Sequence, residues 1–109
     1  MRQAERRRGT LDLPAVVHVD DAHGKVGMVL RVIPQVLPTI DGLGVPQVLK
    51  EVVMSKRGLC ILVGATGSGK STTLAAMIDW RNEHSHGHII TIEDPVEFVH
   101  PHKNCVVTQ

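Results

Sequence analysis

Three glycines and a Lys-Ser pair are the residues best suited to do chemistry. Gly64, Gly67 and Gly69 are followed directly by Lys70 and Ser71, which gives the spacing G-x-x-x-x-G-K-S. Glycines let a loop lie close to phosphate oxygens and offer them backbone N–H groups, while the lysine and the hydroxyl suit phosphate and Mg²⁺. The pattern predicts a loop that binds ATP or GTP, rather than a glycine turn that only connects two elements.

Each residue of this loop has an expected role. Lys70 is expected to reach the β- and γ-phosphates, and the Ser71 hydroxyl to ligate Mg²⁺. Thr72 is expected to hydrogen-bond the α-phosphate, and the N-terminus of the following helix adds free amide donors. The predicted nucleotide-binding residues are Gly64, Ala65, Thr66, Gly67, Ser68, Gly69, Lys70, Ser71 and Thr72.

The elements around the loop must hold it in place. The apolar residues 59–63 predict a buried strand that includes Cys60, because they are rich in branched side chains and too few for a typical helix. Residues 70–78 are good helix formers and predict the helix that follows the loop. A preceding helix is predicted over 46–55 and is stopped by Gly58.

Acidic residues follow the next apolar segment. Residues 88–93 predict a second strand that is stopped by Asp94 and the proline after it, and Glu97 follows soon afterwards. The carboxyl ends of strands are where ligands bind in open α/β sheets, and carboxylates there can orient water or hold Mg²⁺. We predict catalytic roles for Glu93, Glu97 and Lys70, and a water-mediated Mg²⁺ contact for Asp94. A solvated acidic turn is the alternative.

The composition limits the class of protein. The chain has 109 residues and a formal net charge of +1, so no strong attraction to nucleic acid is implied. Because each βαβ unit needs about 30 residues, this length suggests part of a phosphate-loop domain. No apolar run reaches the roughly 18 residues of a membrane span. The two cysteines suit a reducing compartment, so we expect a cytoplasmic chain.

The first part of the chain predicts a hairpin and a linker. Residues 1–9 carry four arginines without apolar periodicity, typical of a frayed terminus or a basic arm. Residues 15–19 and 26–33 predict two strands of a hairpin. Prolines and glycines in 34–44 predict an extended connection. The expected organisation is a partial N-terminal region over 1–33, a linker over 34–44 and the start of an α/β domain over 45–109.

The histidines could suggest a metal site. His84, His86 and His88 alternate, and His100 and His102 flank a proline. No cysteine or carboxylate lies beside them at the spacing usual for zinc, so the sequence favours a loop of solvated histidines.

The segments around the glycine loop resemble a known family. Residues 56–79 and 88–100 are similar to the type IV pilus retraction ATPases, the PilT/PilU family and in particular its PilU branch, within the secretion ATPase superfamily. The similarity spans roughly 26–109, and the acidic segment looks like the Asp box of that family. The resemblance implies an α/β fold, a partial RecA-like phosphate-loop NTPase core preceded by a β-hairpin remnant of a PAS-like domain.

The resemblance also implies an activity and partners. Members of the family hydrolyse ATP with Mg²⁺ as cytoplasmic homohexamers beside the inner-membrane platform of the pilus, where they drive retraction and twitching motility. The resemblance favours Glu97 as the catalytic glutamate, with Glu93 and Asp94 supporting Mg²⁺ and water, whereas position on the strand alone ranks Glu93 first.

The chain departs from the family pattern at both ends. Residues 1–24 do not look like its N-terminal domain, and its Walker B segment and His box are not found up to Gln109. We therefore expect a fragment. The alternatives are a fragment that binds nucleotide without turnover, and a pilus-extension or type II secretion ATPase.

Overall fold

The computed structural model describes the backbone of residues 15–22 and 25–109, and the burial of side chains from Val32 onward. The predicted basic start over 1–9 lies outside the described residues. Within them the chain forms helices and two small sheets, which confirms the α/β class.

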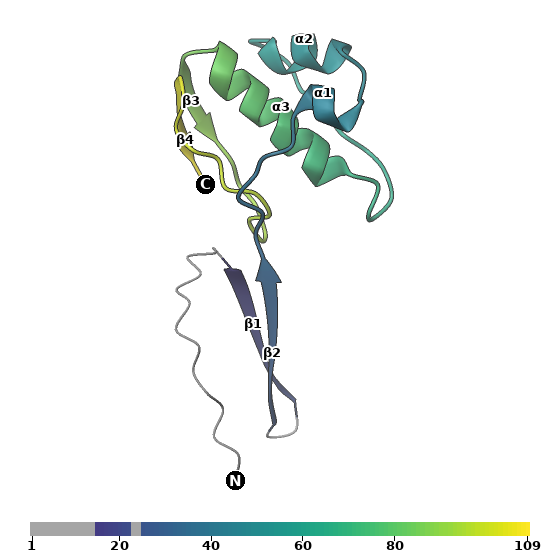
Figure 1. Ribbon diagram of the computed structural model, residues 1–109, viewed down its shortest axis with the longest axis vertical. Coiled ribbons are helices and arrows are strands. Elements are labelled where there is room, and N and C mark those ends of the chain that lie inside the picture. The colour runs from purple at the N-terminus through teal and green to yellow at the C-terminus, as the bar shows by residue number, and fades with distance from the viewer. Residues whose placement is uncertain (1–14, 23–24) are drawn as a thin grey trace.

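The first sheet is an antiparallel hairpin. Strand β1, Ala15–Ala22, pairs with β2, Lys25–Val32, and the hairpin lies apart from the helices (Figure 1). The predicted hairpin is confirmed, although β1 is longer than expected. Asp20 and Asp21 pair with Gly27 and Val26, so these two acidic residues belong to the strand.

Three helices follow the hairpin. They are α1, Ile40–Leu43; α2, Val48–Met54; and α3, Lys70–His84. The two predicted helices are confirmed as α2 and α3, and α3 continues beyond its predicted end. In the part of the chain that the structure describes, none of the helices is both long and apolar enough to cross a bilayer.

The short helix α1 was not predicted, because its region contains the prolines and glycines of the expected linker. Its start is capped by Thr39, whose Oγ1 accepts a hydrogen bond of 3.0 Å from the Gly42 N–H. Its end is closed by Gly44 in the left-handed region at φ 65°. An extended conformation was therefore wrong at 40–43, whereas the domain boundaries remain a prediction.

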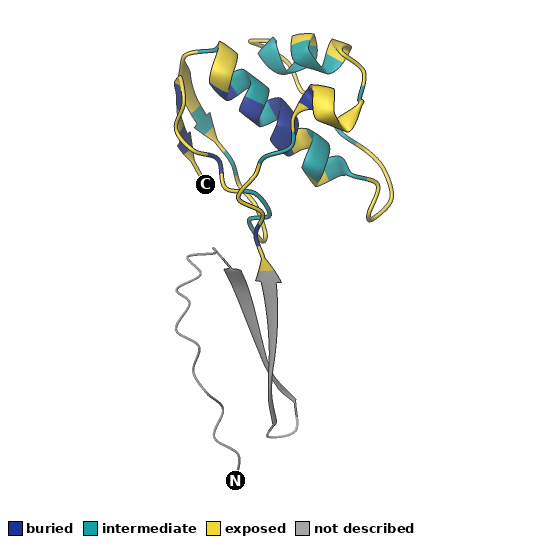
Figure 2. Cartoon of the chain, viewed as in Figure 1, coloured by how far each residue is buried: buried dark blue, intermediate teal, exposed yellow. Residues whose placement is uncertain are grey.

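The helices pack around a small apolar core. Ile40 from α1 meets Ala76 and Met77 from α3, and each of these side chains is at most 3% exposed. Small side chains on α3 allow the shorter helices to approach it closely, and Figure 2 shows the buried stripe along α3. The half-buried residues around this core are Val45, Leu49, Val52, Val53, Leu62 and Trp80.

The second sheet joins segments that are distant in the sequence. Strand β3, Gly87–Ile90, lies parallel to β4, Cys105–Thr108, in register from Gly87 with Cys105 to Ile90 with Thr108. Residues 88–90 confirm the start of the predicted second strand, but β3 ends before the acidic residues. Glu93 and Asp94 therefore lie in the loop after β3 rather than at the strand end.

The apolar segment 59–63 is not a strand, so this prediction was wrong. Its backbone has no strand pairing to any described segment, and Leu59, Ile61 and Val63 are 86%, 69% and 84% exposed. A strand requires a hydrogen-bonded neighbour, and burial requires cover on its faces. Leu62 packs against the core, whereas Cys60 is an exposed free thiol rather than a buried one.

Candidate phosphate-binding site

The glycine loop has the backbone conformation that its glycines allow. Gly67 and Gly69 adopt φ values of 78° and 86°, a region that residues with a Cβ rarely enter. Gly69 is also the N-cap of α3, so the loop passes directly into the helix. The sequence pattern thus predicts the local geometry at these two positions.

Gly64 has a different reason to be glycine. Its φ lies outside the left-handed region, but a Cβ at this position would approach the Ser68 Oγ to 2.6 Å. The loop closes on itself here, because the Ser68 N–H donates a hydrogen bond of 3.2 Å to the Ala65 carbonyl. A side chain at Gly64 would require the Ser68 hydroxyl to move.

Lys70 lies across its own loop. Its Nζ donates hydrogen bonds of 2.8 Å to the carbonyl oxygens of Gly64 and of Ala65. The first hydrogen bond inside α3 runs from the Thr73 N–H to the Gly69 carbonyl at 2.8 Å. The N–H groups before Thr73 therefore have no acceptor within the helix and remain suited to an anion.

The structure brings the start of α3 and the acidic segment, which is residues 91–104 between β3 and β4, to one cavity of about 480 Å³. Ser71 lines it from α3, and the carboxylate-bearing residues Glu93, Asp94 and Glu97 line it from the loop after β3. Its apolar lining is made of Leu74, Ala75, Ile78, Ile90, Ile92, Pro95 and Phe98. Lys70 and the glycines are not part of this lining, so the cavity begins beside the loop.

Glu93 is held by several hydrogen bonds. Burial raises the pKa of its carboxyl, but the neighbouring Thr91 hydroxyl, the Gln109 amide and the backbone N–H of Glu97 lower it. The charge of His100 acts in the same direction, and the pKa of Glu93 lies below its ordinary value. Glu93 is therefore a carboxylate at neutral pH.

His100 is buried, so the predicted loop of solvated histidines was wrong at this position. It is 6% exposed, and its Nδ1 has no hydrogen-bond partner among the described residues. Burial lowers the pKa of its ring, although the charges of Asp79 and Glu93 act to raise it. His84, His86, His88 and His102 are exposed, and no metal-binding group of three side chains forms among the described residues.

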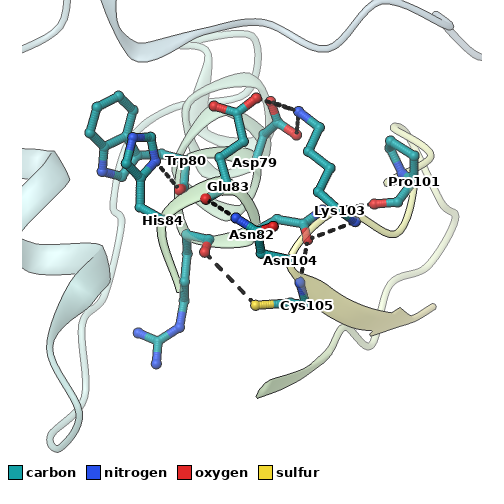
Figure 3. Close-up of polar contacts among 10 residues, drawn as sticks. Asp79, Trp80, Asn82, Glu83, His84, Pro101, Lys103, Asn104 and Cys105 are labelled. Atoms are coloured by element: carbon teal, nitrogen blue, oxygen red, sulfur yellow. Dashed lines mark hydrogen bonds and ion pairs between the residues drawn. The ribbon is translucent and has the colours of Figure 1, made fainter. Parts of the chain in front are cut away.

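A polar network that the sequence did not predict fixes the segment before β4 to α3 (Figure 3). Asn82 is fully buried; its Nδ2 donates to the Pro101 carbonyl at 2.7 Å, and its Oδ1 accepts the N–H groups of Lys103 and Cys105 at 3.3 and 3.2 Å. Lys103 Nζ reaches two α3 carboxylates, Asp79 at 2.7 Å and Glu83 at 2.6 Å.

The charges of this network reinforce one another. Burial lowers the pKa of Lys103, but its hydrogen bonds and ion pairs with Asp79 and Glu83 raise it above the ordinary value. A signal for Asn82 is absent from the sequence, because an asparagine near a helix end is usually solvated or a cap.

Asn82→Ala is expected to destabilise the chain by about 3 kcal/mol. The change removes three hydrogen bonds, one to the buried Cys105 N–H and two to the part-buried Pro101 carbonyl and Lys103 N–H, and each lost hydrogen bond costs about 1 kcal/mol. Urea unfolding followed by circular dichroism measures the free energy of unfolding. Asn104→Ala is the control, because the exposed Asn104 side chain can bond water instead, and an equal loss in both variants would contradict the role of Asn82.

The comparisons with known proteins agree with this geometry. The family model of the type II/IV secretion system proteins matches residues 16–108, and the chain belongs to this family. Within it, the chain is 60% identical over 84 residues to the type IV pilus ATPase PilU of Pseudomonas aeruginosa. It is 53% identical over 83 residues to the type IV pilus retraction ATPase PilT of the same organism.

A solved structure supports the same relationship. The crystal structure of the pilus retraction motor PilT with bound ADP matches 84% of this chain with a TM-score of 0.78 and 46% sequence identity. The matches cover 77% of this chain and 22% of PilU, and 76% of this chain and 24% of PilT. The chain therefore spans about a quarter of the length of these relatives.

Proposed function

We infer that this chain binds ATP with Mg²⁺ as the nucleotide-binding part of a motor ATPase of type IV pilus retraction. The observation that carries the proposal is the glycine loop, which delivers Lys70 and Ser71 at the start of α3 while Ser71 shares a cavity with three acidic residues. The similarity to PilU and to PilT, a protein solved with ADP, supports the same conclusion. The chain is 60% and 53% identical to PilU and PilT but 39% and 42% identical to two type II secretion system E proteins, which favours the pilus branch over type II secretion.

The residues around the cavity fit Mg²⁺. Ser71 is exposed at the cavity, and the nearby carboxylates offer the oxygen atoms that this ion prefers. We propose that the Ser71 hydroxyl holds the ion directly and that Asp94 holds it through water. When bound, Mg²⁺ neutralises charge that develops on the phosphates.

Lys70 must change partners when nucleotide binds. Its Nζ leaves the carbonyls of Gly64 and Ala65 and turns to the β- and γ-phosphates. Hydrogen bonds from the ammonium group to charged phosphate oxygens are stronger than its two exposed hydrogen bonds to neutral carbonyls. The free N–H groups at the start of α3 bind the same phosphates. The nucleotide-binding residues thus act through charge and backbone donors.

Hydrolysis requires a base that accepts a proton from the attacking water. Glu93 and Glu97 both line the cavity, and either carboxylate can orient that water toward the γ-phosphate. We propose Glu97 for this role, because the family resemblance favours it, with Glu93 and Asp94 supporting Mg²⁺ and water. We further propose a cytoplasmic homohexamer with a partial RecA-like core, working beside the inner-membrane platform of a pilus.

The 109-residue chain alone is expected to bind Mg·ATP without appreciable turnover. The loop and the start of α3 supply phosphate binding, whereas efficient hydrolysis needs further catalytic groups around the γ-phosphate. Titration calorimetry measures the binding, and phosphate release measures turnover. A folded chain that ignores Mg·ATP would overturn the proposal, and steady phosphate release that Lys70→Ala abolishes would show that the chain is catalytically sufficient.

A further inference from the structure

The side chain of Gln109 joins the end of β4 to the acidic segment. Its Nε2 donates to Glu93 Oε1 at 3.2 Å and to the Phe98 carbonyl at 2.8 Å. Its Oε1 accepts the His100 backbone N–H at 2.8 Å. One exposed side chain therefore contacts the acidic segment at three places.

These contacts fix a segment that has little other regular structure. Residues 91–104 lie between β3 and β4 and contain no helix or strand. Glu93 and Glu97 belong to this segment, and both line the cavity that Ser71 also lines. A carboxylate acts on a bound nucleotide only if it is held at a defined place, so a support for this segment matters to the site.

The support is itself anchored to α3. Gln109 follows β4, and the residues before β4 are held to α3 by Asn82 and by the ion pairs of Lys103. The helix that begins at the phosphate-binding loop thus determines, through β4, where Gln109 lies. Figure 3 shows the part of this connection between α3 and β4.

We propose that Gln109 is a positioning residue that holds the acidic segment in place, so that Glu93 and Glu97 face the same cavity as Ser71. The inference rests on the proposed nucleotide binding and deepens it. An amide suits this position because it is both a donor and an acceptor. A glutamate keeps the acceptor for the His100 N–H but loses both donors, and a methionine of similar length loses all of these hydrogen bonds.

The test separates these contacts in the full 109-residue chain. ATP affinity is measured by calorimetry with Mg²⁺ and with EDTA, and NMR gives the exchange rate of the His100 amide and the ¹³C signal of the Glu93 carboxyl at pH 7. Gln109→Glu is expected to reduce the gain in affinity from Mg²⁺ about tenfold, as for the loss of one charge-assisted hydrogen bond, while the His100 amide stays protected. Gln109→Met is expected to reduce the same gain and also to speed exchange of the His100 amide about tenfold.

Thr108→Val is the matched control on the same strand. It removes the hydrogen bond of 2.8 Å between Thr108 Oγ1 and the His88 ring, which involves no residue of the segment 91–104, and it keeps the backbone bond from the Thr91 N–H to the Thr108 carbonyl, so every readout should stay unchanged. The proposal would be overturned if both Gln109 variants kept the wild-type gain in ATP affinity from Mg²⁺. It would also be overturned if Thr108→Val reduced this gain as much as the Gln109 variants do.

The two proposals fail in different ways. A wild-type chain that binds no ATP contradicts the proposed function. The contacts of Gln109 are then judged by the His100 amide and the Glu93 carboxyl signal, and if neither responds to the Gln109 variants the positioning role is contradicted as well.

Discussion

Lys70→Ala is expected to lower the affinity of the chain for Mg·ATP by about 100-fold or more. A positive charge placed against phosphate oxygens makes charge-assisted hydrogen bonds, and loss of two of them corresponds to about 3 kcal/mol. The variant should stay folded, because the Gly64 and Ala65 carbonyls that it leaves without Lys70 are on exposed residues and can bond water. Titration calorimetry measures the affinity, and circular dichroism measures the fold.

The matched control for this change is Lys56→Ala. Lys56 is an exposed lysine in the loop between α2 and α3, so its replacement by alanine removes the same charge from the same region. We expect at most a twofold change in affinity, as for a screened surface charge. If a folded Lys70→Ala variant bound Mg·ATP as tightly as the wild type, the glycine loop would not be the phosphate site.

The local structure of the site could be predicted from the sequence because it depends on short-range geometry. The positive φ of Gly67 and Gly69 and the start of α3 at Lys70 follow from residues that are neighbours in the chain. The same holds for the hairpin of β1 and β2 and for α2. Here the sequence pattern contains the physical cause of the structure.

Long-range contacts could not be predicted in the same way. The apolar pattern of 59–63 is that of a buried strand, but a strand exists only when another segment supplies its hydrogen bonds. Strand β4 and the network of Asn82 depend on contacts between residues about 20 positions apart in the sequence. The burial of His100 depends on the tertiary fold around it. No local pattern in the sequence encodes these partners.

Glu97→Gln is expected to slow ATP hydrolysis by about 100- to 1,000-fold while leaving the affinity for Mg·ATP unchanged. Loss of a general base costs this much, and the amide has the shape of the carboxyl that it replaces, so the loop should keep its structure. Because the 109-residue chain alone is expected to show no appreciable turnover, the measurement uses a chimera in which residues 26–109 replace the matching segment of Pseudomonas aeruginosa PilU, with which the chain shares 60% identity.

Glu93→Gln in the same chimera separates the two glutamates. An amide oxygen at this position still accepts from Gln109 Nε2, but it is neutral and therefore a weaker acceptor than the carboxylate, so the change weakens the contact that holds the acidic segment. Glu93→Gln should therefore alter KM as well as kcat, whereas Glu97→Gln lowers kcat alone. If Glu97→Gln turns over normally and Glu93→Gln loses kcat at unchanged KM, the role of the base passes to Glu93, because such a loss shows an interaction made only in the transition state, as a general base makes.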